Sequence, residues 1–370
     1  MPVVNSPAAG LRVLVVTIVH DPEDARIRHR ELPALLQAGA SVTYAAPFGA
    51  YGRTPPDGVR GLDLPRARGR HRLGAVRAAR RLIRAEAGAH DVVLVHDPDL
   101  LPALAGLRGP VRVWDVHEDT AAALGMRGWL PGPLRPVAAA AVRAAERRAD
   151  RRLKLLLAEH GYAQRFAHPH PVVPNSVLVP ADEPPPPGAE RVVYLGRLTV
   201  PRGALDLVEV GRRLAGTVRL ELVGPADADC AGAIRAAHQA GWLHHHGFVP
   251  NSQALALLPG ALAGLSLLHD EPNYAHSQPT KLMEYMGHGL PVVTTPNAVS
   301  VELVERYDCG VVVPFNDPAA ATDAVLALRE DADRRRRLGA AGRAAALADL
   351  DWHTDGATFV ATLAGRAQGR

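Results

Sequence analysis

The sequence has only two cysteines and no hydrophobic run long enough to cross a membrane. Cys230 and Cys309 are far apart and lack the spacing of metal ligands, so neither a disulfide framework nor a cysteine-bound zinc site is indicated. The longest apolar runs fall well short of the roughly 20 residues that a spanning helix needs. The first residues lack a charged segment followed by an apolar one. We therefore expect a soluble cytoplasmic protein.

Two further absences limit the classes of function that the sequence allows. No G-x-G-x-x-G follows any of the strands expected below, which argues against a dinucleotide-dependent oxidoreductase. Lysine is rare in this chain. Lys281 and Lys154 are the only two lysines, and the other cations are nearly all arginine. The retention of Lys281 in such a chain hints at a specific need for it.

The length of 370 residues favours two domains, and an apolar fraction of 47% is sufficient for two cores. The net charge is only +4, but basic residues crowd into residues 66–84. A solvated helix face is the favoured interpretation of this stretch. The alternative is contact with an acidic acceptor or an anionic membrane surface, which would place the protein peripherally at the inner membrane face. Nucleic acid binding is disfavoured because no aromatic residues interleave the arginines.

The first half of the chain alternates buried-strand runs with helical stretches. Strands are expected at residues 11–19, 41–46, 91–95, 111–116 and 153–158, with helices at about 27–37, 73–87 and 137–149. Such alternation predicts a parallel sheet with helices on both faces.

The proline-rich segment 183–188 indicates a stiff linker, after which the alternation restarts. Strands are expected at residues 191–195, 218–223, 243–246, 264–268, 291–295 and 310–313. We place an N-terminal domain at 1–180 and a second at 181–350, with a helix in 351–370 packing back on the first. The predicted fold is α/β, with two doubly wound Rossmann-like domains whose parallel sheets face each other across a ligand-binding cleft.

Residues 270–295 combine a loop, a capped helix and a buried strand. Ser277 or Thr280 can cap the helix start, and Gly289 can end the helix in the left-handed conformation. Lys281 and Glu284 then share one helix face. The positive end of such a helix attracts a diphosphate, and a carboxylate one turn further in can accept hydrogen bonds from both ribose hydroxyls. The alternative is an amphipathic surface helix with an exposed ion pair.

The loop after the strand 191–195 contains a glycine turn and two arginines. Gly196 allows a tight turn, and Arg197 and Arg202 bracket a short segment that leads into a helix. Guanidinium groups beside a helix N-terminus suit a diphosphate leaving group, on which charge builds as its bond to a sugar breaks. The alternative is that these are ordinary arginines at the edge of a sheet.

Together these motifs resemble the retaining glycosyltransferases of family 4, which have the GT-B architecture, and more closely the subgroup with a P-T-K-L-x-E-Y-M motif. The G-R-L pattern with a following basic residue and glycine is matched by Gly196, Arg197, Leu198, Arg202 and Gly203. The E-x7-E motif with its following G-x-P-V-V is matched by Glu284, Gly289, Pro291, Val292 and Val293. The resemblance implies that Glu284 holds the ribose and that Arg197 and Arg202 hold the diphosphate.

One position departs from the family pattern. His276 stands where the first glutamate of E-x7-E should contact the donor sugar. The subgroup often lacks that acid, so activity is not excluded. Glu271 is a candidate replacement carboxylate, while backbone amides from Ser277 to Thr280 are candidates to hold the phosphate and the sugar.

In the first domain, His117 follows the expected strand 111–116. The resemblance implies that this histidine contacts the donor sugar at the reaction centre, and the alternative is a polar loop histidine. Further polar residues at strand ends are candidates for orienting an acceptor: His20, Asp21, Asp24, Arg26, His96, Asp97 and Asp99, together with Glu31. It is equally plausible that Asp24 and Glu31 only cap and decorate the next helix.

Two sequence patterns resemble metal sites. Asp97-Pro98-Asp99 mimics the D-x-D signature of a different, single-domain glycosyltransferase fold, and adjacent histidines in residues 244–246 point to opposite faces of a strand, so the three cannot converge on one ion. We therefore predict no metal and no cofactor. Residues near this strand end are candidates to contact the nucleotide base: Glu221, Gly224, Phe248 and Val249.

The sequence thus predicts a metal-independent retaining glycosyltransferase that transfers a hexose or N-acetylhexosamine from a nucleotide diphosphate, preferably UDP, to a hydroxyl of a small-molecule or lipid-linked acceptor. The catalytic candidates are His117, Arg197, Arg202 and Glu284. Two alternatives remain at this stage. They are a GT-B nucleotide-sugar epimerase and a catalytically silent nucleotide-sugar-binding protein.

Overall fold

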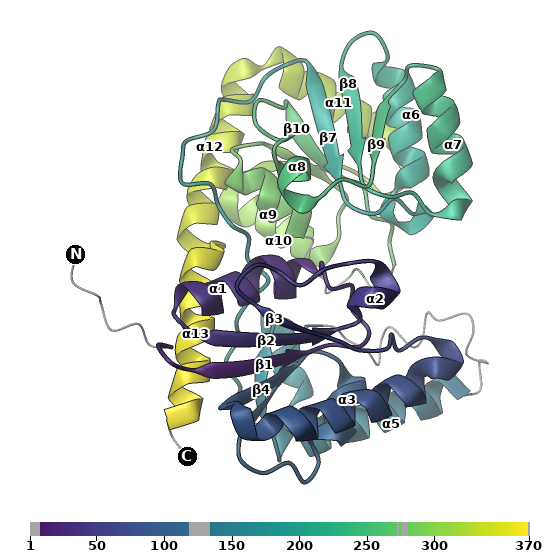
Figure 1. Cartoon of the computed structure of the whole chain (residues 1–370). Coiled ribbons are helices and arrows are strands. Elements are labelled where there is room, and N and C mark those ends of the chain that lie inside the picture. Colours follow the sequence, from purple (N-terminus) through teal and green to yellow (C-terminus); the bar gives the residue numbers. More distant parts are fainter. Residues whose placement is uncertain (1–7, 118–133, 272–273, 275–279, 369–370) are drawn as a thin grey trace. The chain divides into compact units, whose positions relative to one another are not determined.

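The computed structural model describes residues 8–117, 134–271, 274 and 280–368. The chain forms two compact units. The first comprises Met1–Asn175 and His353–Arg370, and the second comprises Ser176–Trp352. The chain therefore leaves the first unit near residue 175 and returns to it for its last helix (Figure 1).

The first unit contains a six-stranded parallel sheet in the order β3-β2-β1-β4-β5-β6. Its strands are β1 (Arg12–Val16), β2 (Ser41–Ala46), β3 (Arg60–Asp63), β4 (Val92–Val95), β5 (Val111–Val116) and β6 (Lys154–Leu157). This is the doubly wound order, in which the first and fourth strands are neighbours at the point where the chain switches direction across the sheet. Ligands of such folds bind beyond the carboxyl ends of the strands at this switch point.

Helices connect these strands. A π-helical turn at Ile27–Glu31 continues directly into α1 (Leu32–Gln37), and the other helices are α2 (Phe48–Tyr51), α3 (Arg72–Glu86), α5 (Leu134–Asp150) and α13 (Trp352–Gln368). α3 buries Ala75, Ala79 and Ile83 at helical spacing against the sheet. Its opposite face exposes four arginines of the basic stretch, which are Arg77, Arg80, Arg81 and Arg84.

The second unit repeats this topology. Its strands are β7 (Arg191–Leu195), β8 (Arg219–Val223), β9 (His244–Gly247), β10 (Ala263–Ser266), β11 (Val292–Thr294) and β12 (Gly310–Val312). They are parallel and lie in the order β12-β11-β10-β7-β8-β9. Counted from β7, this is the same doubly wound order as in the first unit, with β7 and β10 at the switch point.

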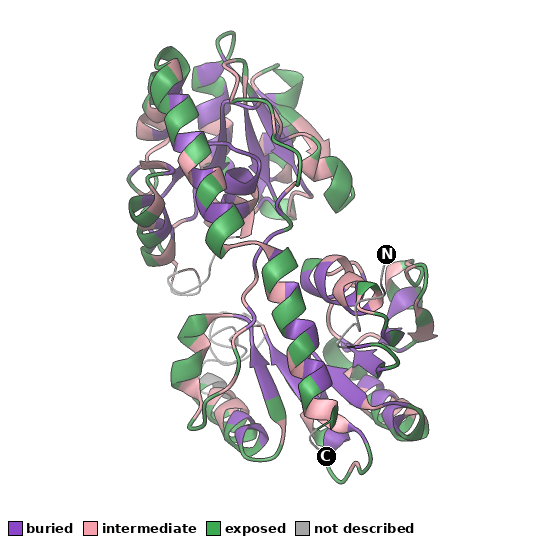
Figure 2. Ribbon diagram, turned by 90° about the vertical axis from the view of Figure 1, so that its left-hand side faces the viewer, coloured by how far each residue is buried: buried purple, intermediate pink, exposed green. Residues whose placement is uncertain are grey.

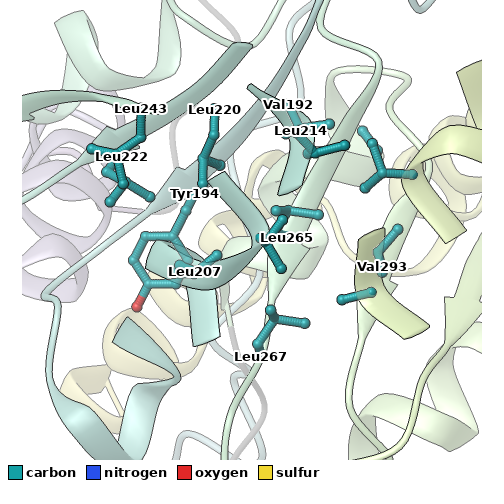
Figure 3. Packing of buried hydrophobic residues seen from close by; sticks show 14 of the residues in the cluster. Val192, Tyr194, Leu207, Leu214, Leu220, Leu222, Leu243, Leu265, Leu267 and Val293 are labelled. Atoms are coloured by element: carbon teal, nitrogen blue, oxygen red, sulfur yellow. The ribbon is translucent and has the colours of Figure 1, made fainter. Parts of the chain in front are cut away.

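Helices cover both faces of the second sheet. They are α6 (Ala204–Leu214), α7 (Ala228–Gln239), α8 (Asn251–Leu255), α9 (Thr280–Gly287), α10 (Ala298–Tyr307), α11 (Pro318–Glu330) and α12 (Ala332–Asp349). Val192 and Tyr194 of β7 pack with α6, α7 and α11 in one core cluster, part of which is shown in Figure 3. Val193 and Leu195 pack with α9, α10 and the end of α12 in another. In both units the sheet strands are largely buried (Figure 2), which explains their continuous apolar runs.

The expected strands agree with most of the observed ones. The strands at 41–46, 111–116 and 191–195 have the expected ends, and the other expected strands overlap observed ones. Strand β3 was missed. Its sequence, RGLD, has no apolar run because it is a half-exposed edge strand paired only with β2.

The unit boundary lies before the expected position at residue 180. Val177 and Val179 are buried in the core of the second unit, so the chain has already entered that unit before the prolines. Val177 also exchanges backbone hydrogen bonds with the end of the second unit, since its N–H donates to Leu350 (3.0 Å) and its carbonyl accepts from Trp352 (2.8 Å). Helix α13 belongs to the first unit, where Arg366 donates to the carbonyl of Leu155 at 3.1 Å.

None of the described helices combines the length and the apolar composition that a bilayer crossing requires.

Candidate active site

At the carboxyl end of the second sheet, the loop after β7 is folded tightly against its neighbours. The N–H of Gly196 donates to the carbonyl of Val223 at the end of β8 (2.9 Å). A short 3₁₀ turn at Val200–Arg202 then ends at Gly203, which has a φ of +78° and leads directly into α6. A Cβ at Gly203 would lie 2.0 Å from the carbonyl oxygen of Leu267 after β10. This position therefore requires glycine for both its conformation and its contact.

Lys281, in the first turn of α9, lies against this loop. Its Nζ is buried, has no hydrogen-bond partner among the described residues, and lies 3.8 Å from the ring centroid of Tyr194. A Cβ at Gly196 would be in ordinary contact with Nζ, at 3.6 Å, so it is the φ of +118° that favours glycine at this position. Burial lowers the pKa of Lys281 well below its usual value, and the nearby charge of Arg202 lowers it further while that of Glu284 opposes the change. An anion bound at this position would favour the charged form of this poorly solvated amine.

Helix α9 is fixed in place by Tyr285. The Tyr285 hydroxyl accepts a hydrogen bond from the N–H of Leu195 (2.9 Å) and donates one to the carbonyl of Leu265 (3.1 Å). One buried side chain thus joins the ends of β7 and β10, the two strands at the switch point. The preceding residue, Glu284, is half-buried. As expected, Gly289 follows the helix with a positive φ, of 70°.

The two arginines of the β7 loop differ in their surroundings. Arg202 is half-buried and near Lys281, whereas Arg197 is exposed and its Nε pairs with Asp227 at 3.0 Å. Beside them lies a pair that the sequence analysis did not select. The His269 Nε2 and an Asp206 oxygen are 2.6 Å apart, and the His269 N–H donates to the carbonyl of Pro201 inside the loop. Asp206 and His269 therefore help to hold in place the loop that carries Arg197 and Arg202.

The turns after β8 and β9 are joined. The N–H of Gly224 donates to the carbonyl of Gly247 at 2.9 Å, and the next residue, Phe248, leaves 59% of its surface exposed. An exposed aromatic ring beside these turns is a suitable surface for a base. Glu221 lies further back in β8, where its two oxygens contact Arg219 and His246.

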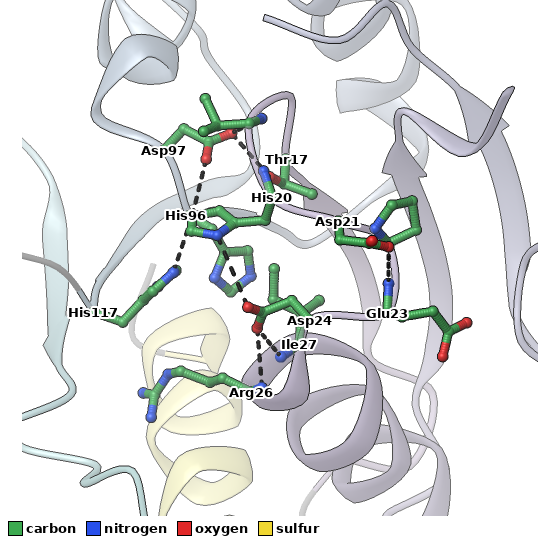
Figure 4. A network of polar contacts seen from close by, with 12 residues as sticks. Thr17, His20, Asp21, Glu23, Asp24, Arg26, Ile27, His96, Asp97 and His117 are labelled. Atoms are coloured by element: carbon green, nitrogen blue, oxygen red, sulfur yellow. Dashed lines mark hydrogen bonds and ion pairs between the residues drawn. The ribbon is translucent and has the colours of Figure 1, made fainter. Parts of the chain in front are cut away.

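A second polar cluster lies at the strand ends of the first unit (Figure 4). His20 follows β1, and His117 follows β5. Their Nε2 atoms are 3.1 Å apart, and the His20 Nε2 also lies 3.2 Å from Asp97. Since Nδ1 of His117 lies 3.1 Å from Asp115, the neutral His117 ring carries its proton on Nδ1 and accepts from His20 at Nε2.

Asp115 is the charged centre of this cluster. Both of its oxygens accept from Arg26, at 2.7 and 2.8 Å, and neither side chain is more than 4% exposed. Burial favours protonation of Asp115, but Arg26 and the neighbouring histidines hold its pKa well below the usual range. Burial also lowers the pKa of His117, but Asp115 outweighs this effect and the net pKa is raised.

His96 and Glu31 are more deeply buried than His20 and His117. Both are fully buried, with a His96 nitrogen 3.3 Å from Glu31 and the other 3.4 Å from Asp115. Burial lowers the pKa of His96, and burial together with Asp115 raises that of Glu31 well above its usual value. The alternative in which Glu31 only caps or decorates the next helix therefore does not hold, because its side chain is fully buried beside Arg26 and His96.

The remaining aspartates have separate roles. Asp24 accepts hydrogen bonds from the N–H groups of Arg26 and Ile27. It therefore caps the helical turn, which is one of the two alternatives expected from the sequence. Asp97 is buried and accepts from the N–H of Ile18 (2.6 Å) in the turn after β1. Asp21 caps its own turn through the N–H of Glu23, and Asp99 pairs with Arg72 through two bonds of 2.7 Å. Of these four aspartates, Asp24 and Asp97 contact His20, at 3.9 and 3.2 Å.

Two expected donor contacts, His276 and Ser277, lie outside the described residues, and Thr280 begins α9. Asp115 is the main residue that sequence reasoning did not select. A signal for it was present, since a carboxylate interrupts the apolar run of a central strand, where an unpaired charge would be costly.

Residues 189–331, less than half of the chain, match the family model described as Glycosyl transferases group 1. No curated protein matches the sequence.

Solved structures align with nearly the whole chain. Sucrose-phosphate synthase from Thermosynechococcus elongatus has a TM-score of 0.73 at 17% identity, covering 97% of this chain and 100% of that chain. Anabaena HepE in complex with UDP-glucose gives 0.68 at 15% identity, covering 96% and 100%. WaaG, a glycosyltransferase involved in lipopolysaccharide biosynthesis, gives 0.68 at 13% identity, covering 96% and 100%. The chain therefore has the α/β fold of GT-B glycosyltransferases, with a segment of its second unit matching the group 1 glycosyl transferase family.

Proposed function

We propose that this protein is a retaining glycosyltransferase. It transfers a hexose or an N-acetylhexosamine from a UDP-sugar to a hydroxyl group of a small-molecule or lipid-linked acceptor. The second unit binds the nucleotide, and the histidine cluster of the first unit acts on the reacting sugar and the acceptor.

The single observation that carries this proposal is the environment of Lys281. A buried lysine amine without a hydrogen-bond partner among the described residues lies against the glycine turn at Gly196 and near the charge of Arg202. Leaving a cation desolvated in this way is costly unless an anion completes the site. A diphosphate supplies that charge, and Glu284, one turn along α9, is then suited to the ribose hydroxyls.

The choice of UDP is supported by relatives in structure. Anabaena HepE was crystallised with UDP, with UDP and glucose, and with UDP-glucose. In this chain the exposed Phe248 lies next to the joined turns at Gly224 and Gly247, which offer main-chain groups to a base. We assign Phe248 and Val249 to the base and withdraw Glu221, because both of its oxygens already have partners.

His117 is the group we assign to the transferred sugar. Its ring is held by Asp115 and has a raised pKa, so the protonated form can donate to a sugar hydroxyl. We propose that the acceptor attacks on the face from which the phosphate leaves, and that the departing phosphate takes the acceptor proton. His20 and Asp24 then orient the acceptor hydroxyl. The anomeric configuration of the product, measured by NMR, tests retention.

The protein's own cations carry the charge of the leaving group in this scheme. Arg197, Arg202 and Lys281 are the candidates, so we propose that no divalent ion is needed at the diphosphate. Equal initial rates with and without added Mg²⁺ or Mn²⁺ are expected. Rates that require either ion would contradict this assignment.

A panel of nucleotide sugars tests the overall proposal. A donor present at 100 times its dissociation constant stabilises the folded state by about 2.7 kcal/mol, which a thermal-shift assay detects. We expect one UDP-sugar to raise the melting temperature most and to be hydrolysed or transferred when it is incubated with the enzyme. Binding of UDP without turnover of any sugar would identify a silent binding protein, and the absence of any nucleotide binding would overturn the proposal altogether.

A further inference from the structure

The edge strand β9 brings two histidines onto one face of the second sheet. Residues on a strand alternate between faces, so His244 and His246 share a side, and their ring centroids are 4.4 Å apart. His245 points the other way, with its Nε2 2.9 Å from the carbonyl oxygen of Gly224. The expectation that the three consecutive histidines cannot converge holds for His245, but the other two do converge.

A carboxylate from the neighbouring strand completes the group. Glu221 of β8 is paired in register with His244, and its Oε2 lies 2.7 Å from the Nε2 of His246. One ligand atom from each of the three side chains lies within 4.8 Å of the others. Two imidazoles and a glutamate form a donor set that suits zinc and similar divalent transition metals.

We propose that Glu221, His244 and His246 form a binding site for a divalent transition-metal ion of the zinc class. The three side chains supply two nitrogen ligands and one oxygen ligand. The site lies at the sheet edge, where His244 is exposed, so water can occupy the fourth position of a tetrahedral ion.

A second group in the first unit, His96, Asp115 and His117, also brings ligand atoms close together. There, however, both oxygens of Asp115 accept from Arg26, which is only 4% exposed and is also held by hydrogen bonds to Asn175 and Val173. At Glu221 the competing cation is Arg219, whose side chain is 63% exposed and contacts the carboxylate through Oε1. Arg219 can swing into water when a metal binds, whereas Arg26 cannot, so we assign the metal to the second unit.

The position of the site suggests what the ion would do. The register between β8 and β9 shifts at Leu222 and Val223, directly after the pairing of Glu221 with His244. A metal held by both strands would fix this irregular pair and the start of the Gly247–Phe248 turn. The ion is structural in this scheme, and its ligands come from β8 and β9, whereas Lys281 lies in α9 and Arg202 in the turn after β7. The inference therefore does not depend on the proposed transfer reaction.

Metal titration tests the site. The protein is used without a histidine tag, because a tag would add further metal-binding histidines to the 17 that the chain contains. The protein is first dialysed against a chelator and then titrated calorimetrically with Zn²⁺, and with Co²⁺ to record its visible absorption. The variants are His244→Asn and His246→Asn. His245→Asn, adjacent but facing the other way, and His117→Asn, in the competing group, are the matched controls.

We expect one ion per chain, a Zn²⁺-dependent rise in melting temperature, and a tetrahedral Co²⁺ spectrum. Each ligand variant should weaken binding by more than the roughly 10- to 100-fold that loss of an outer-shell partner costs. Both controls should bind as the parent protein does. The proposal is overturned if the parent protein binds no ion, if the ligand variants bind equally well, or if His117→Asn removes the binding. Circular dichroism without metal shows that each variant is folded.

Discussion

At the scale of single residues, the most informative feature is the burial of ionisable side chains. Lys281 and Asp115 are both enclosed by the protein, but Asp115 is paired with Arg26 while the Nζ of Lys281 has no hydrogen-bond partner among the described residues. A buried ionisable group that is paired has its charge satisfied within the protein, whereas one without a hydrogen-bond partner among the described residues is a candidate to receive a ligand. This contrast distinguishes Asp115, which holds its neighbours in place, from Lys281, which we propose binds the nucleotide.

Replacement of Glu284 tests the nucleotide site. Glu284→Ala should remove two charge-assisted hydrogen bonds to the ribose, each worth about 1.5 to 3 kcal/mol, and so weaken UDP binding at least tenfold. Isothermal titration calorimetry with UDP measures this loss. Glu302→Ala, an exposed glutamate on α10 of the same unit, is the control and should bind UDP normally. Unchanged affinity in a folded Glu284 variant would contradict the ribose assignment.

Replacement of His117 separates chemistry from binding. His117→Ala should lower the transfer rate by about 100-fold or more, because a positioned acid or hydrogen-bond donor is lost at the reacting sugar. UDP affinity should not change, since the nucleotide contacts that we propose are all in the second unit. His71→Ala, at an exposed histidine of the first unit, serves as the control in the same assay. A fully active His117 variant would reduce this residue to a structural role.

His117 also predicts a pH dependence of stability. Asp115 overcomes the effect of burial and raises the pKa of His117 above its ordinary value of 6.5. The charged pair therefore contributes its full stability below pH 6.5, and this contribution is lost as the pH rises through the raised value. His117→Gln should cost more stability at pH 5.5 than at pH 9, as measured by urea unfolding. An equal cost at both pH values would show that Asp115 does not hold a charged ring.

At the scale of elements, apolar patterning predicted most strands because the central strands are buried on both faces. The runs that form β4, β5 and β7 are continuous in the sequence for this reason. β3 lacks such a run, since it is an edge strand that neighbours only β2. Helix α9 was predicted from its capping residue and its terminal glycine, but its anchor, Tyr285, depends on two strands that are distant in the sequence.

The anchor of α9 can be tested by removing one oxygen atom. Tyr285→Phe should leave the N–H of Leu195 and the carbonyl of Leu265 buried without a partner, at a cost of about 1 to 3 kcal/mol. Tyr307→Phe is the control, because that hydroxyl donates to Asp349 at an exposed position and should cost about 0.5 kcal/mol or less. Urea denaturation of both variants gives the comparison. Equal costs would mean that the buried Tyr285 hydroxyl contributes no more to the free energy of unfolding than the exposed Tyr307 hydroxyl does.

At the scale of the whole molecule, the same strand order occurs twice. Each unit places its candidate residues beyond the carboxyl ends of strands at or beside the switch point, as doubly wound sheets generally do. The last helix, α13, belongs to the first unit although 177 residues of the second unit, Ser176–Trp352, separate it from the rest of that unit in sequence. The first unit is therefore complete only when the C-terminus has been made.

Truncation tests the role of α13. Deletion of residues 353–370 removes the buried side chains of Phe359 and Leu363, each worth about 1.5 to 3 kcal/mol, so the first unit should lose roughly 3 to 6 kcal/mol. Deletion of residues 368–370 alone is the control and should leave stability unchanged. Differential scanning calorimetry should show a lowered transition in the longer deletion. Coincident melting of both truncations with the full chain would refute the contribution of this helix.

The sequence by itself determined the local features of this protein, because they depend on neighbouring residues. These features are the buried strands, the glycine that ends α9, and the helix face shared by Lys281 and Glu284. Only the tertiary structure decided which strand ends meet, since strand order is set by packing between distant segments. It therefore brought His20 and His117 together, enclosed Glu31, and paired Glu221 with His244 and His246, contacts that no local pattern in the chain could have revealed.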